Sequence, residues 1–89
     1  MRLDYDLDAR ALYVTITNGP VARTVPVDDS TNVDVDAGGQ LVGVEVLDYG
    51  RPWPLEQILS RWRVSESHAG CLRAVLAAGL RAPEMSVVA

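Results

Sequence analysis

The spacing of apolar residues changes near residue 50, and no other feature constrains the possible folds of this chain as strongly. Before that point apolar and polar residues alternate, as in MRLDYDL at residues 1–7. A period of two is typical of strands with one buried face. Beyond it, Leu55, Ile58 and Leu59 recur at the spacing of an amphipathic helix. The sequence therefore predicts an α+β fold, with a sheet first and helices after it.

The first half predicts five strands joined by short turns. The alternating segments are residues 1–7, 11–17, 21–27, 32–36 and 40–48. Connections this short favour antiparallel neighbours, so we expect a four- to five-stranded antiparallel meander sheet. Pro26 has no N–H to donate to a ladder, which predicts an edge position or a bulge for the third segment.

The second half predicts two C-terminal helices packed on one face of that sheet. The first begins at Pro54 and carries Trp62, and the second is capped by Ser65 or Ser67. The buried face of the second helix is expected to contain Ala69, Leu72, Val75, Leu76 and Leu80. Trp53 and Trp62 are predicted core anchors, because each indole can bury about 200 Å².

Length, composition and charge fit one small domain over residues 1–89, with a sheet region at 1–49, a helical hairpin at 53–82 and a tail at 83–89. Residues 1–50 hold three arginines against nine carboxylates, a net charge of −6, whereas residues 51–89 carry +2. The acidic half repels phosphate backbones, so nucleic acid is not an expected partner.

No apolar run reaches the ~20 residues that span a bilayer, so no membrane association is expected. A single cysteine and an N-terminus unlike a signal peptide predict a cytoplasmic protein.

The segment DVDAGGQLVGVE, residues 34–45, has the residue spacing of an EF-hand calcium loop. Such a loop must lie between two helices. Here β-branched residues and Pro26 precede it, and Pro52 and Pro54 follow it closely. The alternation of apolar residues also continues through its second half. We therefore predict a β-hairpin with a glycine turn and no metal site.

No other motif in the sequence predicts catalysis or a cofactor. Cys71 follows His68 by three residues, but no carboxylate or oxyanion loop completes a catalytic set, and the pair is half of a closed zinc site. We expect Cys71 in the core and His68 facing solvent. Asp4, Asp6 and Asp8 share one side of a strand, which predicts a solvated face. The chain is therefore expected not to be an enzyme.

Several strand sequences resemble a known family. They are Tyr5, ALYV at residues 11–14, NVDVD at 32–36 and GVEVL at 43–47. Together they resemble, over residues 3–48, a group of small bacterial domains of unknown function. Arg10 stands where that family usually has aspartate. The resemblance implies a small meander sheet, no established enzymatic activity, and a regulatory, antitoxin-like role beside a toxin-like partner.

The strand at residues 40–48 is expected to carry the interaction surface. Glu45 falls on the same predicted face as Leu41 and Leu47. Either it pairs across strands with Arg10 or Arg23, or it lies in a shallow ligand or partner site. Both faces of this strand look apolar and the helices cover only one, so a homodimer is predicted through the second face or an edge strand. The alternative is that the helices form the surface that meets another protein, and the isolated chain is then a monomer. The possible interaction residues are Tyr13, Arg23, Leu41, Glu45 and Leu47.

These features predict a non-enzymatic protein-interaction or regulatory module. The alternative is a DNA-binding regulator that uses residues 55–80, whose rhythm resembles a helix-turn-helix. Leu59 and Arg63 count against it, because a small residue and a glycine are usual at those two places. No catalytic, metal or cofactor-binding residue is predicted.

Overall fold

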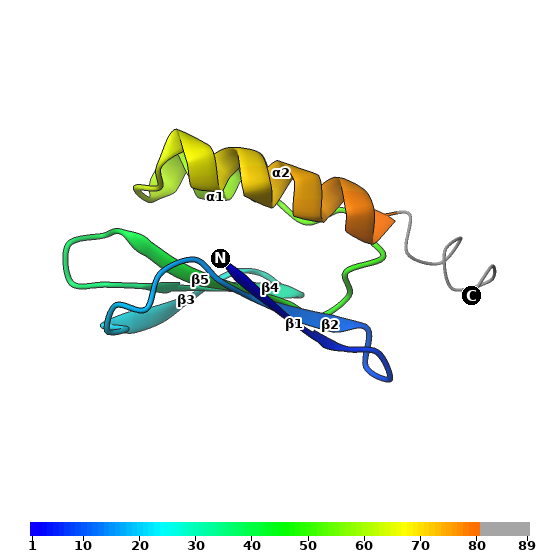
Figure 1. Cartoon of the computed structure of the whole chain (residues 1–89). Coiled ribbons are helices and arrows are strands. Elements are labelled where there is room, and N and C mark those ends of the chain that lie inside the picture. Colours follow the sequence, from blue (N-terminus) through cyan, green and yellow to red (C-terminus); the bar gives the residue numbers. More distant parts are fainter. Residues whose placement is uncertain (81–89) are drawn as a thin grey trace.

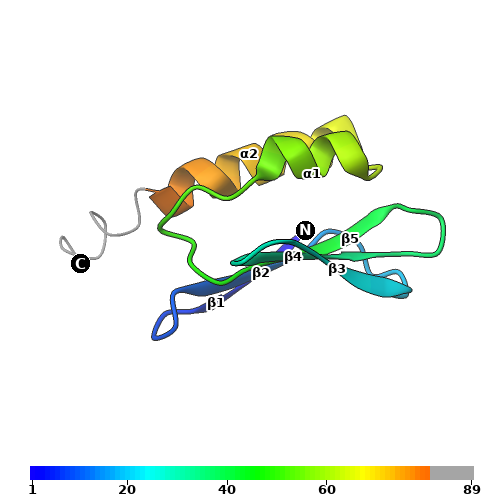
Figure 2. The same cartoon turned by 180° about the vertical axis from the view of Figure 1, so that it is seen from behind.

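The structure is a computed structural model that describes residues 1–80, and it contains five strands and two helices. They are β1 (Arg2–Asp6), β2 (Ala11–Thr15), β3 (Arg23–Asp28), β4 (Thr31–Val35), β5 (Leu41–Val46), α1 (Leu55–Arg61) and α2 (Glu66–Leu80). Both helices lie over one face of the sheet, and the other face stays open (Figures 1 and 2). This confirms the α+β class. The predicted tail at 83–89 lies outside the described residues.

The strand order is β1-β2-β5-β4-β3, and every neighbouring pair is antiparallel. The predicted simple meander is therefore wrong in one respect, because β5 lies between β2 and β4. The chain leaves β2, crosses to the far edge to form β3, and returns through β4. β5 is the most apolar strand, and in the centre of the sheet it has a neighbouring strand on each side, β2 and β4. Pro26 lies in β3, at an edge as predicted, with a register irregularity between Pro26 and Asp28.

The core lies between the helices and the inner face of the sheet. On that face Leu12 is opposite Val46, while Val14 and Val33 flank Val44. All five side chains are buried. From the helical half come Trp53, Leu55, Ile58, Trp62 and Leu72, all buried. The prediction that both tryptophans are core anchors is confirmed.

Cys71 is exposed, so its predicted place in the core is wrong. α2 turns Leu72 toward the sheet, and each residue is rotated by about 100° from the one before it. That rotation points Cys71 away from the sheet.

Ser65 caps α2 as predicted, because its Oγ accepts the N–H of His68 at 3.1 Å. No helix within residues 1–80 is both long and apolar enough to cross a membrane.

A β-bulge changes the alternation in β5. Asp34 is opposite Gly43, but its neighbour Val35 is opposite Leu41, so β5 carries one extra residue at this point. An extra residue moves the following side chains to the other face. Leu41 is therefore buried on the inner face. The prediction that Leu41 shares a face with Glu45 is wrong, because the bulge intervenes.

Residues 36–40 form the predicted hairpin turn. Gly39 has φ of 82°, in the left-handed region that suits glycine. The Asp36 carboxylate accepts the backbone N–H groups of Gly38 and Gln40, each at 2.9 Å. Strands flank this turn on both sides, whereas an EF-hand requires helices. Across residues 1–80, no group of three or more His, Cys, Asp or Glu side chains is arranged to hold a metal ion.

Candidate functional site

Glu45 and Tyr13 lie side by side on the outer face of the sheet, the face without helices. The Glu45 carboxylate accepts a hydrogen bond from the Asn32 side-chain amide at 2.9 Å. The predicted arginine partners lie elsewhere. Arg10 is paired with Asp48 at 3.5 Å, and Arg23 is opposite Val35, on the inner-face side of β3. The predicted arginine pairing of Glu45 is therefore wrong, because Arg10 pairs with Asp48 and Arg23 lies on the other face of the sheet.

Tyr13 belongs to a polar network on this outer face. Its hydroxyl donates to Asp34 at 2.5 Å, and the Thr24 hydroxyl donates to the same carboxylate at 2.5 Å. Partial burial, the hydrogen bond to Asp34 and the negative charges of Asp34 and Glu45 together raise the pKa of Tyr13 to about 12. All these effects disfavour the phenolate.

The outer face is therefore polar, and the predicted apolar second face is not present. Of the two leucines assigned to it, Leu41 is in the core and Leu47 is exposed beyond the end of β5. A face-to-face dimer would bury carboxylates instead of apolar side chains, which is costly. The five predicted interaction residues do not form one site: Tyr13 and Glu45 lie together, and the other three lie apart from them.

An open hollow lies between the β4–β5 turn and the turn that joins α1 to α2, with a volume of about 940 Å³. The backbone of Arg63 connects the two turns, because its carbonyl accepts the Leu41 N–H at 2.9 Å and its N–H donates to the Gly39 carbonyl at 3.2 Å. The lining residues are Arg23, Gly38, Gly39, Gln40, Leu59, Ser60, Arg61, Trp62, Arg63, Val64 and Ser65. We call this hollow the arginine cleft.

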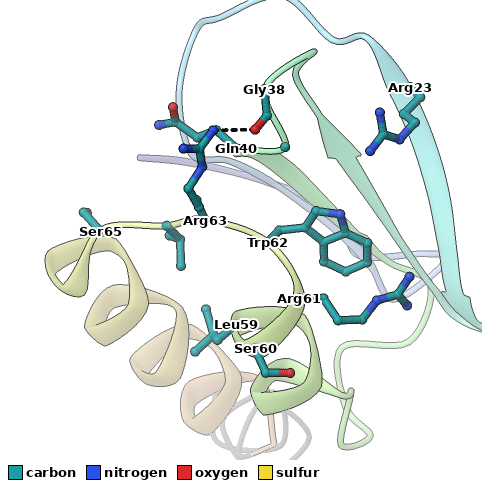
Figure 3. A pocket seen from close by; sticks show the side chains of 11 residues that line it. Arg23, Gly38, Gln40, Leu59, Ser60, Arg61, Trp62, Arg63 and Ser65 are labelled. Atoms are coloured by element: carbon teal, nitrogen blue, oxygen red, sulfur yellow. Dashed lines mark hydrogen bonds between the residues drawn. The ribbon is translucent and has the colours of Figure 1, made fainter.

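Three arginines from two parts of the chain dominate the arginine cleft (Figure 3). The Arg61 guanidinium lies 4.4 Å from the centroid of the Trp62 ring, a cation–π contact. Arg23 points toward the same ring from β3, and Arg63 donates to the Gly38 carbonyl. No carboxylate within residues 1–80 lines the cleft. Within residues 1–80, none of these three arginines forms an ion pair.

Arg23 was among the predicted interaction residues, whereas Arg61 and Arg63 were not predicted as parts of a site. Arg23 is separated from them by about forty residues, and only the fold brings β3 close to the α1–α2 turn. One signal was available, namely the RWR sequence at residues 61–63 within the half of the chain that carries net positive charge.

The edge strand β1 exposes a row of apolar side chains. Leu3 and Tyr5 of β1, and Leu7 directly after the strand, are 39%, 46% and 73% exposed. Leu3 and Tyr5 project toward the helix side of the sheet, opposite Val14 and Leu12 of β2. Every residue of β1 is exposed, and among the strands of residues 1–80 this is true of β1 alone.

A smaller hollow of about 300 Å³ lies where β4 and β5 meet the segment before α1. Thr31 and Trp53 line it, and both are buried. Neither Thr31 Oγ1 nor Trp53 Nε1 has a hydrogen-bond partner among residues 1–80. Asp28 and Asp48 also line this hollow, but each already accepts a backbone N–H from a neighbouring residue.

Comparison with known proteins shows a match to a protein family. Residues 2–49 match the model of a family described as "Protein of unknown function (DUF2283)". The match covers β1 to β5 and ends before the helices. No curated protein and no solved structure gives a significant match to the chain.

Proposed function

The chain belongs to a family of proteins of unknown function, and we propose that it is a non-enzymatic protein-interaction module that forms a homodimer through β1. The observation that carries this proposal is the open β1 edge, with the exposed side chains of Leu3 and Tyr5 in the strand and of Leu7 directly after it. An edge strand offers unpaired N–H and C=O groups to another strand. Exposed apolar side chains beside such an edge favour association.

The opposite edge is less suited to pairing. β3 contains Pro26, which has no N–H, and its ladder is irregular between Pro26 and Asp28. Both features discourage the addition of a strand. β1 has no proline and pairs with β2 in unbroken register over all five of its residues. A second copy is therefore expected at β1.

The side chains of β1 are complementary to a second β1 in antiparallel orientation. With the twofold axis at Asp4, Leu3 lies opposite Tyr5 of the second copy on the helix side. On the outer face, Arg2 lies opposite Asp6 of the second copy. Both contacts occur twice because the interface is symmetric. Cross-strand pairs of these kinds stabilise antiparallel sheets, whereas the single Asp4–Asp4 pair opposes them.

Light scattering at about 50–100 µM tests the dimer, because association depends on concentration. We expect a mass near twice the 9.6 kDa of the chain. Leu3→Asp should return the mass to that of the monomer. Val21→Asp is the matched control, because Val21 is also an exposed apolar residue but lies outside β1. A wild-type mass near 9.6 kDa would remove the proposal.

A charge exchange tests the register of the dimer. Arg2→Asp alone places two carboxylates opposite each other and should weaken the dimer, and Asp6→Arg alone should do the same with two guanidiniums. The double variant restores opposite charges and should recover the dimer. If the double variant dissociates as readily as the single ones, the strands do not pair about Asp4.

Three expectations from the sequence, which concern the role, the location and an alternative function of the protein, remain predictions. They are the regulatory, antitoxin-like role with a toxin-like partner, the location in the cytoplasm, and the alternative of a DNA-binding regulator that uses residues 55–80. Identification of proteins that co-purify with the chain from its native cell tests the first. Binding of duplex DNA tests the last.

A further inference from the structure

We infer that the arginine cleft is a second binding site, separate from β1, and that it takes an acidic segment of a partner protein. The first support is the charge of its lining. Arg23, Arg61 and Arg63 line it, and no carboxylate from the described part of the chain does. The chain as a whole carries a net charge of −4, so this concentration of positive charge is local. A carboxylate-rich segment complements it.

The second support is the state of the arginine side chains. Arg23 and Arg61 form no ion pair with any residue in 1–80, although the chain contains twelve carboxylates. The guanidinium of Arg61 is held against the Trp62 ring, which restricts its motion before a ligand arrives. A guanidinium held in this way loses less conformational freedom when it binds a carboxylate in bidentate geometry.

The third support is the shape of the cleft. It is open and wide, and backbone from the β4–β5 turn forms one wall while the α1–α2 turn forms the other (Figure 3). Sites for small molecules enclose most of the ligand surface, which an open hollow does not do. An extended protein segment can lie along such a hollow with part of its surface in solvent. Leu59 and Val64 in the lining can contact its apolar side chains.

The acidity of the remaining surface argues against nucleic acid as the ligand. Asp34, Glu45 and other carboxylates lie on the outer face, and the first fifty residues carry a net charge of −6. A duplex is long and uniformly charged, so it interacts with this acidic surface as well as with the cleft. A short acidic segment reaches the cleft alone.

Fluorescence anisotropy with a labelled hexaglutamate peptide tests the inference on the full-length protein. We expect binding that weakens as sodium chloride rises from about 50 to 300 mM. Arg23→Gln combined with Arg61→Gln should weaken binding by about tenfold. Arg51→Gln is the matched control, because Arg51 is exposed, forms no ion pair within residues 1–80 and lies outside the cleft. Circular dichroism confirms that each variant is folded.

Three results would overturn the inference. One is the absence of binding with the peptide at about 1 mM. The second is an equal loss of affinity in Arg51→Gln, which shows general attraction between charges. The third is tighter binding of a short DNA duplex or of tripolyphosphate than of the peptide, which assigns the cleft to phosphate groups. The dimer mass is measured in parallel, and Leu3→Asp should leave peptide binding unchanged, so failure of the dimer and failure of the cleft are separable.

Discussion

At the scale of single residues, Tyr13 is the side chain whose protonation the fold changes most clearly. Its pKa is raised from 10 to about 12, first by burial and then by the hydrogen bond to Asp34. Between these pH values the unfolded phenol loses its proton while the folded phenol keeps it. The stability that Tyr13 contributes is therefore complete below pH 10 and is lost as the pH rises toward 12.

The substitution Tyr13→Phe tests this pH dependence. We expect the wild-type protein to lose its stability advantage over Tyr13→Phe between about pH 10 and 12, because only the wild type has the perturbed phenol. Urea unfolding of both proteins at a series of pH values measures the difference. Tyr5 and Tyr49 are present in both proteins, so the comparison isolates the contribution of Tyr13. A stability difference between the two proteins that stays constant from pH 10 to 12 would contradict the raised pKa of Tyr13.

Gly43 is the residue that allows Tyr13 to lie flat on the sheet. A Cβ at this position would overlap the Tyr13 hydroxyl and lie 2.7 Å from its ring carbon Cζ. Tyr13 is not opposite Gly43 in the ladder but opposite Glu45, its neighbour on the same face of β5. The ring therefore extends along the strand, over the space that glycine leaves.

Gly43→Ala is expected to destabilise the protein by about 1–3 kcal/mol, the usual cost of overpacking. In a Tyr13→Ala background the same change should be neutral or stabilising by about 0.5–1 kcal/mol, because alanine is favoured over glycine in a strand. Denaturant unfolding of the four proteins gives the coupling between the two sites. Equal effects in both backgrounds would show that the ring does not need the space above Gly43.

At the scale of elements, α2 is attached to the sheet by few residues. Leu72 is fully buried and Ala69 nearly so, whereas Val75 and Leu76 are only partly covered. At its exposed side, Arg73 donates to both oxygens of Glu56 in α1 at 2.9 Å. This ion pair lowers the pKa of Glu56 but is exposed to solvent, so apolar contact carries most of the attachment.

The adjacent substitutions Leu72→Ala and Cys71→Ala test how α2 is oriented. Leu72→Ala should cost about 2–5 kcal/mol, the range for removal of a large aliphatic side chain from a core. Cys71→Ala should change stability by no more than about 0.5 kcal/mol, because the thiol is exposed. Thermal or denaturant unfolding measures both. Similar costs for the two variants would mean that α2 is rotated relative to this structure.

At the scale of the whole molecule, the family match does not include the segment that completes the core. The match ends at residue 49, but the inner face of the sheet is covered by the segment from Trp53 to Leu80 (Figure 1). Without that segment Leu12, Val14 and Val44 would lie in water. A single sheet with one uncovered apolar face is not stable in isolation.

A fragment of residues 1–49 is therefore expected not to fold alone. Its circular dichroism should show no cooperative thermal transition, and its amide NMR signals should lack the dispersion of a folded sheet. The full-length protein serves as the control under the same conditions. A fragment that unfolds cooperatively would show that the helices are an addition to a sheet that is stable without them.

The sequence by itself determined the elements and several of their ends. Alternation located the five strands, helical spacing located α1 and α2, and the glycine turn at residues 37–39 was distinguishable from a calcium loop. Pro26 identified an edge strand, and Trp53 and Trp62 were recognisable as core residues. These features follow from the backbone preferences and side-chain periodicity of neighbouring residues, which are present in the sequence before any long-range contact forms.

The tertiary structure alone decided the strand order, the face of Leu41, the partner of Glu45 and the arginine cleft. The strand order depends on the path of the chain between β2 and β3, and the residues of that connection do not encode the path. The face on which Leu41 lies depends on one extra residue in β5. That residue reverses the alternation without an obvious signal in the sequence. The cleft requires Arg23 and Arg61 to meet across the fold. Contacts between residues far apart in the chain are set by the burial of the whole inner face, and no local pattern records them.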